Sequence, residues 1–422
     1  MFLLYNILLT IFSPLWVPWM LWRTAKRKEK PNWAERQGNF DLKPRKDRQR
    51  VWIHAVSVGE VMAALPILRE VKARLPEHEI VLSVTTSSGH QTARDKTEGL
   101  VDHLVYFPLD VARFQLAAMQ RVQPSVVAIM ETELWMNFLW AAKVFGAHTL
   151  LLNGRISDRS FPRSSKLKFF YRVLLAQVDR CLMQTPKDAE RILALGAKSA
   201  EIFGNCKYDQ AAEQDGGERD WRAELGLIAD RPVLVIGSTR SSEEEDFVLE
   251  ALRLFGLDRL AIVHAPRHLE RAEALAAKVP GSWRRSQGTP PAPVSYVVLD
   301  SYGELGSVYA IADIVLIGGS FVDHGGQNLL QPLAHGKPVL HGCYMQNFRD
   351  VAEAARLAGA TNEADTPAEL AAQIEFLLSH PAERAAMGEA ARKLVEANLG
   401  ASARYAEAVA EAAREPLSRK GR

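Results

Sequence analysis

Short apolar runs alternate with amphipathic stretches along most of the chain, after a polar stretch at residues 31–50. In the first half, runs rich in β-branched residues begin at Val51, Ile80, Val101, Val126 and Thr149. Between them, residues 61–75 and 135–145 place apolar side chains at helical spacing. A second series of candidate strands covers residues 233–236, 260–264, 296–299, 314–317 and 339–340. Strands that alternate with helices predict parallel sheets with helices on their faces.

The two series predict an α/β protein with two doubly wound, Rossmann-like halves. The charged, Gly-containing stretch 213–231 is the predicted linker. We therefore expect an N-terminal segment at residues 1–30, a first domain at 31–212, a second at 213–395 and a helical tail at 396–422. The Ala-rich helices of residues 381–415 are expected to pack on the surface. Two such halves leave a cleft between them, and ligands bind beyond the carboxyl ends of the strands.

The N-terminal segment is apolar, because residues 2–22 carry no charge. This length is close to what is needed to cross a hydrocarbon core of about 30 Å. Basic residues follow, at Arg23, Lys26, Arg27, Lys28 and Lys30. A secretory signal has its positive charge before the apolar stretch, so we expect an uncleaved anchor with the bulk of the chain in the cytoplasm. Pro14, Pro18 and the clustered Trp16, Trp19 and Trp22 leave open a segment that enters only one leaflet.

Composition narrows the possible partners of the 422-residue chain. Hydrophobic residues make up 47% and charged residues 24%, as in folded soluble proteins. The net charge of +2 gives no global basic field, so nucleic acid is not an expected partner. Cys181, Cys206 and Cys343 lie far apart in sequence, which indicates neither a zinc knuckle nor a disulfide framework.

The first half ends several predicted strands with acidic or basic residues. Glu60 opens the helix after the first strand, where the helix dipole favours its ionised form. A general base and a helix cap are both compatible with that position, and the cap is the more common role. Glu131 and Glu133 follow another strand, and either orient cations or are solvated. Lys207 and the basic residues of NGRISDRS, which include Arg155 and Arg159, are candidates to hold an acidic sugar or phosphate.

The second half has glycine pairs around one predicted helix start. Gly318 and Gly319 follow a buried strand, and Gly325 and Gly326 precede a helix predicted to begin near Asn328. Glycines let the backbone approach a ligand, and free N–H groups at a helix start accept phosphate. The sequence has no P-loop, no HExxH and no DxD pair after a strand, so neither ATP hydrolysis nor a metal site is expected. Arg, Lys and helix N-termini must then neutralise a leaving phosphate.

In this order, the strings HAVSVGE, METELW, NGRISDRS, GNCKYD, GSTRSSEEE, PRHLER, DSYGEL, IADIVLIGGSF and GGQNLLQP resemble those of the 3-deoxy-D-manno-octulosonic acid (Kdo) transferases of lipopolysaccharide synthesis. The resemblance implies a GT-B architecture of two Rossmann-like domains facing an interdomain cleft. It implies metal-independent transfer of Kdo from CMP-Kdo to a lipid A precursor on the cytoplasmic face of the bacterial inner membrane. CMP-Kdo is then a substrate, the first domain takes the acceptor, the second takes the CMP-sugar, and no cofactor is implied.

Site residues are also implied by the resemblance. Glu60 would be the general base that deprotonates the acceptor hydroxyl, and Glu131 and Lys207 would support the transition state. The implied CMP-binding residues are Pro266, Arg267, Tyr302, Gly303, Glu304, Gly319, Ser320, Asn328, Leu329, Leu330 and Gln331. Direct displacement at the anomeric carbon then inverts its configuration. Membrane lipids are a further expected partner, because the basic flank of the anchor attracts acidic head groups.

This sequence departs from the family pattern where GGHNPLEP is usual. It has Gln327, Leu329 and Gln331 there, and Met136 replaces a proline after METELW. An amide at position 331 accepts weaker hydrogen bonds than a carboxylate. We therefore expect a donor site that is retained but retuned. Two alternatives stay open: a GT-B relative with another nucleotide sugar, as transferase or epimerase, and a non-catalytic membrane-tethered binding protein.

Overall fold

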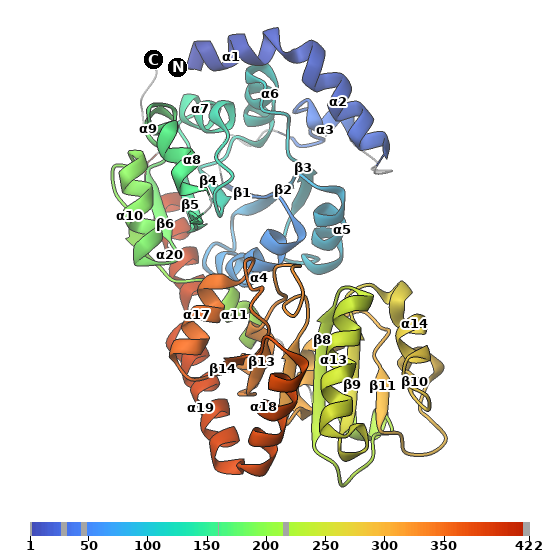
Figure 1. The fold of residues 1–422 in the computed structure, drawn as a ribbon. Coiled ribbons are helices and arrows are strands. Elements are labelled where there is room, and N and C mark those ends of the chain that lie inside the picture. Colours follow the sequence, from blue (N-terminus) through green and yellow to red (C-terminus); the bar gives the residue numbers. More distant parts are fainter. Residues whose placement is uncertain (1, 27–31, 44–48, 159, 214–218, 417–422) are drawn as a thin grey trace. The chain divides into compact units, whose positions relative to one another are not determined.

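Two sheets of parallel strands form the framework of the chain (Figure 1). The computed structural model describes residues 2–26, 32–43, 49–158, 160–213 and 219–416. The chain divides into unit 1, residues 1–210 and 399–422, and unit 2, residues 211–398. In this division residues 399–422 belong to unit 1.

The sheet of unit 1 has the strand order β3-β2-β1-β4-β5-β6-β7. Its strands are β1 (Arg50–Ala55), β2 (Glu79–Val84), β3 (His103–Tyr106), β4 (Val126–Met130), β5 (His148–Gly154), β6 (Arg180–Met183) and β7 (Glu201–Ile202). Its helices are α1 (Phe2–Ile11), α2 (Ser13–Lys26), α3 (Trp33–Arg36), α4 (Val58–Arg74), α5 (Ser87–Lys96), α6 (Ala112–Val122), α7 (Met136–Val144), α8 (Phe161–Lys166), α9 (Lys168–Leu175), α10 (Pro186–Leu195) and α20 (Ala401–Arg414). Helix α11 (Lys207–Ala212) leads into unit 2.

Both faces of β1 are buried, as expected for a parallel sheet covered by helices. Val51 and Ile53 face a core shared with α4 and α20, whereas Trp52 faces a second core shared with α6 and α7. Tyr405 of α20 is fully buried in the first of these cores. The prediction that the Ala-rich tail packs only on the surface is therefore wrong for α20, because its alanines and Tyr405 form part of the unit 1 interior.

Unit 2 repeats the arrangement with the strand order β10-β11-β9-β8-β12-β13-β14. Its strands are β8 (Val233–Thr239), β9 (Ala261–Pro266), β10 (Trp283–Arg284), β11 (Tyr296–Val298), β12 (Ile314–Ile317), β13 (Val339–His341) and β14 (Thr361–Glu363). Its α-helices are α12 (Trp221–Glu224), α13 (Ser242–Phe255), α14 (Ala272–Ala277), α15 (Leu305–Val308), α16 (Leu330–Ala334), α17 (Arg349–Leu357), α18 (Pro367–Ser379) and α19 (Pro381–Ala397). Short 3-10 helices are η1 (Leu257–Arg259), η2 (Leu269–Arg271), η3 (Arg285–Gln287) and η4 (Tyr309–Ile311).

The stretch predicted as a linker is partly folded into unit 2. Residues 214–218 lie outside the described residues, but α12 follows them and buries Trp221 completely. Asp220 caps α12 by accepting a hydrogen bond from the backbone N–H of Ala223. The buried indole anchors this segment to unit 2, because a Trp side chain typically buries about 200 Å² of surface.

Candidate active-site residues

In unit 1, the strand order reverses between β1 and β4, which are neighbours in the sheet although β2 and β3 lie between them in sequence. Ligands of open α/β sheets bind at such a switch point, beyond the carboxyl ends of the strands. Glu60 lies in the first turn of the helix after β1, and Glu131 follows β4 directly. The fold therefore brings both predicted acids to the same switch point.

Glu60 is held at the start of α4 by hydrogen bonds with the N-cap residue Ser57 and with Val56. The Ser57 hydroxyl oxygen accepts from the Glu60 backbone N–H at 3.4 Å, and Glu60 Oε2 accepts from the Val56 N–H at 2.9 Å. The Ser57 hydroxyl also donates to Glu60 Oε1 at 3.1 Å. The capping role that the sequence left open is therefore present. It does not exclude catalysis, because the same bonds fix the carboxylate in one orientation.

The electrostatics of Glu60 differ from those of an ordinary exposed cap. Its side chain is only 8% exposed, and this burial raises its pKa from 4.5 to about 7. The hydrogen bonds from Val56 and Ser57 act in the opposite direction, whereas the nearby charges of Glu131 and Glu133 raise the pKa further. A carboxyl group with a pKa near neutrality exchanges protons efficiently under cellular conditions.

Glu131 and Lys207 form an ion pair, with Lys207 Nζ 2.8 Å from Glu131 Oε1. Both side chains are partly exposed, so they remain accessible from solvent. Glu131 has a φ of 55°, a left-handed conformation that is strained for a side chain of this kind. Its backbone N–H donates to the Leu152 carbonyl at 2.8 Å, which holds it there. The fold thus places a negative and a positive group beside one another at a strained strand end.

The remaining candidates of unit 1 have mixed placements. Glu133 is partly buried, and its pKa is raised by that burial and by the charge of Glu131. Asn153 is buried, and its side-chain oxygen accepts from the Cys206 N–H, next to Lys207. Arg155 is partly buried, and Arg159 lies outside the described residues. Of the residues in NGRISDRS, Asn153 helps to position Lys207, because it binds the backbone of the preceding Cys206.

In unit 2, the switch point lies between β8 and β12. A buried acid that the sequence did not single out, Glu244 of α13, joins the loops that follow these two strands. Its Oε2 accepts from the Arg240 N–H at 2.8 Å, and its Oε1 accepts from the N–H groups of Ser320 and Phe321 at 3.0 and 3.2 Å. Ser241 caps α13 and is three residues before Glu244, so the spacing of a capping box was the available signal.

The predicted donor residues of the glycine-rich loop differ in what they can offer a ligand. Gly319 has a φ of +69°, which favours glycine, and a Cβ there would meet Gln327. Ser320 is fully buried, and its hydroxyl group donates to the Ile317 carbonyl while the hydroxyl oxygen accepts from the Gly342 N–H at 2.9 Å. Its polar atoms therefore stabilise the loop, and a direct bond to CMP would require them to exchange partners.

The segment Asn328–Gln331 enters α16, which begins at Leu330 and not at Asn328. The side chains of Leu329 and Leu330 are buried in unit 2, so only their backbones are placed to meet a nucleotide. The Asn328 side chain accepts from the Leu330 N–H at 3.0 Å. The helix start that was predicted to cradle a phosphate is thus partly capped by its own asparagine.

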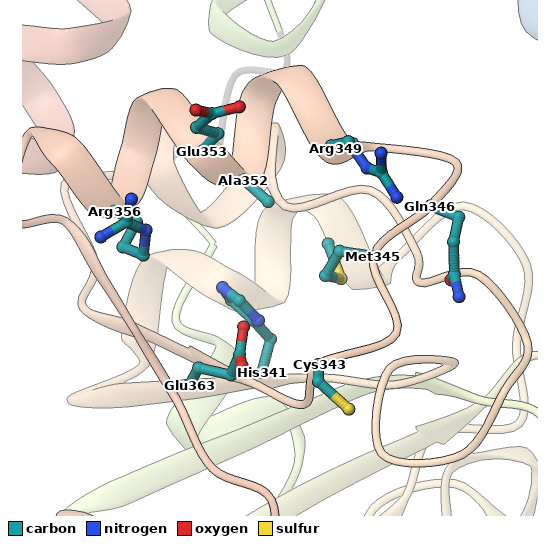
Figure 2. A pocket seen from close by; sticks show the side chains of 9 residues that line it. All are labelled: His341, Cys343, Met345, Gln346, Arg349, Ala352, Glu353, Arg356 and Glu363. Carbon is teal, nitrogen blue, oxygen red and sulfur yellow. The ribbon is translucent and has the colours of Figure 1, made fainter. Parts of the chain in front are cut away.

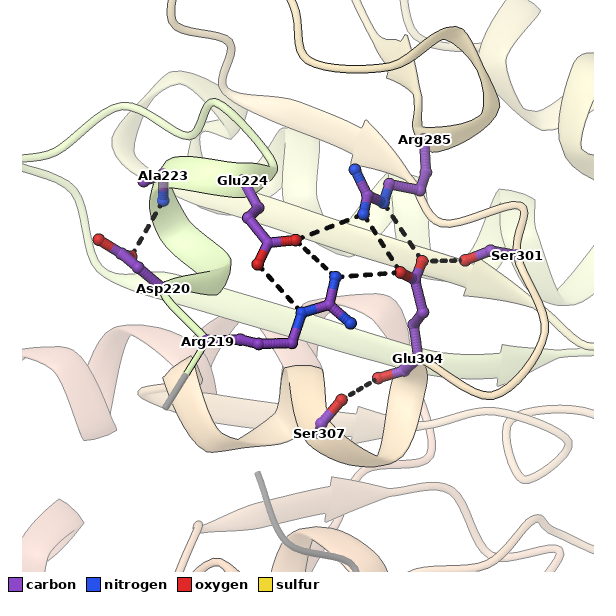
Figure 3. Close-up of polar contacts among 8 residues, drawn as sticks. All are labelled: Arg219, Asp220, Ala223, Glu224, Arg285, Ser301, Glu304 and Ser307. Atoms are coloured by element: carbon purple, nitrogen blue, oxygen red, sulfur yellow. Dashed lines mark hydrogen bonds and ion pairs between the residues drawn. The ribbon is translucent and has the colours of Figure 1, made fainter. Parts of the chain in front are cut away.

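Glu304 belongs to a charged network at the start of α15 (Figure 3). Arg285 donates to both of its carboxylate oxygens at 3.2 Å, and the Ser301 hydroxyl donates to one of them. Arg219 lies 3.5 Å from Glu304 and also pairs with Glu224. Burial alone would raise the pKa of Glu304, but the bonds from Arg285 and Ser301 outweigh it and lower the pKa. Glu304 is therefore a fixed, ionised acceptor.

Four further candidates lie at or after strand ends of unit 2. Pro266 ends β9, and the backbone N–H of the exposed Arg267 donates to the Thr239 carbonyl at 2.8 Å. Tyr302 is 79% exposed, and Gly303 has a φ of +86° with open space where a Cβ would lie. Arg267, Tyr302 and Gly303 are exposed and accessible to a ligand, whereas Pro266 is buried.

A pocket of about 200 Å³ lies beyond the end of β13, between α17 and β14 (Figure 2). Its lining includes His341, Cys343, Gln346, Arg349 and Arg356, and it contains none of the predicted donor residues. Burial lowers the pKa of His341, whose Nδ1 donates to the Gly342 carbonyl at 2.9 Å. Within the described part of the chain, no group of three or more His, Cys, Asp or Glu side chains is arranged to hold a metal ion.

Comparisons with known proteins cover both units. Residues 31–210 match the family described as 3-Deoxy-D-manno-octulosonic-acid transferase (kdotransferase), and residues 294–394 match Glycosyl transferases group 1. A bifunctional glycosyltransferase/methyltransferase of Fusobacterium nucleatum is 32% identical over 362 residues, which are 83% of this chain. The chain spans about half the length of that relative, 55%.

The 3-deoxy-D-manno-octulosonic acid transferase of Bordetella pertussis is 34% identical over 429 residues, covering 96% of this chain and 98% of the relative. The crystal structure of a glycosyltransferase from Rickettsia africae has a TM-score of 0.60 at 13% identity, covering 89% of this chain and 100% of that one. The structural likeness shows the GT-B fold alone. The sequence identity shows more: the chain belongs to the family of Kdo transferases, the glycosyltransferases that move Kdo from CMP-Kdo in lipopolysaccharide core synthesis.

Proposed function

We propose that this protein is an inverting transferase that moves Kdo from CMP-Kdo to a hydroxyl group of a lipid A precursor, with Glu60 as the general base. The observation that carries the proposal is the state of Glu60, a buried carboxyl at the switch point of unit 1 with a pKa of about 7. A sugar hydroxyl is a poor nucleophile until a base removes its proton during attack. Glu60 is oriented by Ser57 and Val56 for that task.

The proposed reaction is a single displacement. Glu60 takes the proton of the acceptor hydroxyl, and the hydroxyl oxygen forms a bond to the anomeric carbon of Kdo. The bond between that carbon and the phosphate oxygen breaks, and its electron pair leaves with CMP. Attack from the face opposite CMP inverts the anomeric centre. The Lys207–Glu131 pair supplies a fixed charge arrangement beside Glu60 that stabilises the transition state.

CMP is proposed to bind residues in the loops that follow the strands of unit 2. Arg267 meets its phosphate charge, Glu304 accepts from its hydroxyl or amino groups, and the backbone at Gly303 and Gly319 allows close approach. Pro266, Tyr302, Asn328 and Gln331 complete the proposed donor set. Ionised Glu304 accepts stronger hydrogen bonds than a neutral group does, which makes it the main anchor of this set. The proposed route needs no metal, since cationic side chains and backbone N–H groups meet the charge of the leaving phosphate.

The protein is further proposed to work at the cytoplasmic face of the inner membrane, where a lipid-borne acceptor is presented. The apolar residues 2–22 and the basic residues that follow them support this location. The same basic cluster is suited to the phosphates of a lipid A precursor.

The test is incubation of the purified chain with CMP-Kdo and tetraacylated lipid A precursor, with and without EDTA, followed by mass spectrometry of the lipid. We expect Kdo-bearing lipid in both samples. The Glu60→Gln variant is expected to lose about 10²–10⁴-fold in kcat, the typical contribution of a general base, while its Kd for CMP stays unchanged in calorimetry. Full activity of Glu60→Gln would remove the proposed base, and loss of product with EDTA would exclude the metal-free route.

A further inference from the structure

The apolar N-terminal segment is joined to the rest of unit 1 by partly buried polar contacts. The Tyr5 hydroxyl donates to Asp110 Oδ2 at 2.8 Å. The side-chain amides of Asn6 and Asn137 exchange two hydrogen bonds, at 2.9 and 3.0 Å. Asp110 also accepts from the backbone N–H groups of Asn137 and Phe138. We call Tyr5, Asn6, Asp110 and Asn137 the polar joint. It fixes the first turns of α1 to the start of α7.

Aromatic contacts reinforce the polar joint. The rings of Phe2 and Trp140 have centroids 4.4 Å apart, and those of Tyr5 and Phe170 are 6.0 Å apart. Helix α1 therefore has one face on α7 and α9 of unit 1 (Figure 1). In a free transmembrane helix, a tyrosine and an asparagine in the first two turns would lose these partners and would be costly to bury in lipid.

The other end of the segment also returns to unit 1. After α2, the short helix α3 is attached to the end of β3. Arg36 donates to the carbonyls of Phe107 and Thr85, and the Glu35 carboxylate accepts from the Tyr106 N–H at 2.6 Å. Because both ends are fixed to one folded unit, both lie on the same side of any membrane that the unit contacts. A single crossing would place them on opposite sides.

Side-chain hydrogen bonds satisfy backbone carbonyl groups near the break between α1 and α2. In the described residues no single helix is long and apolar enough to cross a bilayer, and the pair Phe2–Ile11 and Ser13–Trp19 is bent by 65°. The Trp16 indole donates back to the Leu9 carbonyl at 3.0 Å, and the Ser13 hydroxyl donates to the Thr10 carbonyl. Helix α1 has 10 residues and is about 15 Å long, half of a hydrocarbon core of about 30 Å.

The outer surface of the segment is apolar. Its large exposed apolar side chains are Leu3, Leu4, Ile7, Leu8, Ile11, Phe12, Leu15, Trp19 and Trp22. Phe169 and Leu167 of the neighbouring α8–α9 region are also exposed, by 59% and 50%. Exposed basic residues accompany them at Arg163, Lys166, Lys168 and Arg172, and no acidic residue occurs between 161 and 178. Exposed apolar and basic side chains on neighbouring helices, which the contact between Tyr5 and Phe170 joins, complement an anionic phospholipid bilayer.

From these contacts we infer that α1 and α2 form a re-entrant, monotopic attachment. The bent pair enters one leaflet of an anionic bilayer, and both of its ends stay on the side of unit 1. The inference rests on the proposed membrane location and replaces a single spanning anchor with a surface fixed to the acceptor-binding unit. The polar joint then sets the depth and orientation of unit 1 at the lipid surface, which is where a lipid-borne acceptor hydroxyl has to reach Glu60.

The topology test uses the full chain with a protease-cleavable tag placed before Met1. Right-side-out and inside-out inner-membrane vesicles are treated with the protease, and cleavage of the tag is compared with digestion of unit 2. We expect both in the same vesicle orientation. Tag cleavage in the opposite orientation would overturn the inference. Transfer from CMP-Kdo is assayed in parallel in detergent. Tag cleavage in the opposite orientation with intact transfer would overturn only the inference on the membrane attachment. Tag cleavage in the expected orientation without any transfer would contradict only the proposed function.

A second arm identifies what covers the apolar surface. The purified chain is floated with vesicles of phosphatidylethanolamine and phosphatidylglycerol. Leu3→Glu is expected to lower the vesicle-bound fraction about tenfold or more, since an apolar contact becomes a charge repelled by anionic lipid. Leu357→Glu is the matched control, because Leu357 is 72% exposed and Leu3 is 71% exposed, and it should float like the wild type. If the wild-type chain formed a soluble dimer and did not bind the vesicles, the apolar surface would be an interface between two copies, and the inference would be overturned.

Discussion

At the scale of single residues, Glu60 shows how one carboxyl serves both the fold and the proposed chemistry. The bonds from Ser57 and Val56 favour the ionised form, but burial and the charges of Glu131 and Glu133 favour the neutral form. The balance places the pKa at about 7. A helix cap alone does not require a buried carboxyl group, because exposed acids cap helices equally well. The burial is therefore the feature that distinguishes a candidate base from an ordinary cap.

The pKa of Glu60 leads to a prediction about pH. The proposed base works when ionised, so log kcat is expected to rise with pH and level off above about 7. Stability changes in the opposite direction. Between pH 4.5 and about 7 the folded state keeps a proton that the unfolded state has lost, so the free energy of unfolding falls as pH rises.

The variant Glu60→Gln removes that ionisation. Above pH 7 it is expected to be more stable than the wild type by an amount of the order of 1–3 kcal/mol, although inactive. Urea unfolding at pH 5 and pH 8 measures the difference, which should be small at pH 5. An activity profile that is flat across neutral pH, together with no stability gain at pH 8, would contradict the assignment.

Backbone strain at Glu131 gives a second prediction for a single residue. A φ of 55° costs a glutamate about 1 kcal/mol or more, whereas asparagine tolerates it better. We expect Glu131→Asn to raise the free energy of unfolding by roughly 0.5–1 kcal/mol and to lower kcat by about 10²-fold or more. Gln123→Asn is the matched control, because Gln123 has a φ of 48° at the end of α6. Gln123→Asn should gain stability without losing activity. An equal loss of kcat in both variants would contradict a specific role of Glu131 in transfer.

At the scale of elements, Glu244 connects the carboxyl ends of β8 and β12 through α13. Glu244→Ala leaves the buried N–H groups of Arg240, Ser320 and Phe321 without their acceptor, at about 1–3 kcal/mol for each unsatisfied group. We expect unit 2 to unfold at a lower temperature and the Kd for CMP to rise about tenfold or more, since the loop containing Gly319 loses its fixed position. Glu243→Ala, in the exposed neighbour, should change neither quantity. Unchanged CMP binding by Glu244→Ala in calorimetry would show that the loop is positioned by other contacts.

The long elements of this fold follow from the sequence, whereas the short ones do not. Strands such as β1 and β8 have six and seven residues and contain the continuous apolar runs 51–53 and 233–236. The strands β7 and β10 have two residues each, too few to show a period, and they form because neighbouring strands offer unpaired backbone groups. Helix α20 was recognised as a helix, but its alanines do not reveal which unit they pack against.

The same division holds for the candidate site. The placement of Glu60 and Glu131 at one edge of the sheet could be predicted because strand ends of parallel sheets meet there, whereas the roles of Glu60, Glu131 and Lys207 stay predictions drawn from the family resemblance. Glu244 was missed because it lies in a run of three glutamates, and the sequence does not show which of them is buried. Ser320 looks like a polar loop residue, yet it is fully buried with its hydroxyl bonded inside the loop. Burial of polar groups depends on contacts between distant segments, which local patterns do not contain.

At the scale of the whole molecule, the chain leaves unit 1, forms unit 2 and then returns to complete the first core with α20. Unit 1 is therefore discontinuous, and its stability depends on residues that follow the whole of unit 2. Units with separate cores unfold as separate transitions unless a large apolar interface couples them. Each unit has a fully buried tyrosine next to its sheet, Tyr405 in unit 1 and Tyr309 in unit 2.

These two tyrosines allow the dependence to be tested by calorimetry. Tyr405 packs against α4 and the sheet, and its hydroxyl donates to the Gly204 carbonyl at 2.7 Å. Truncation of a buried aromatic side chain costs about 3–5 kcal/mol, which lowers the melting temperature of a unit of this size by roughly 10 °C. Tyr405→Ala should therefore shift one calorimetric transition, and Tyr309→Ala should shift the other. The transition that Tyr405→Ala lowers should also be the one that Val51→Ala lowers, because Val51 lies in the same core although it belongs to the first strand of the chain. If Tyr405→Ala instead lowered the transition of Tyr309→Ala, the last helix would stabilise the unit that precedes it in sequence, and the discontinuous core of unit 1 would be wrong.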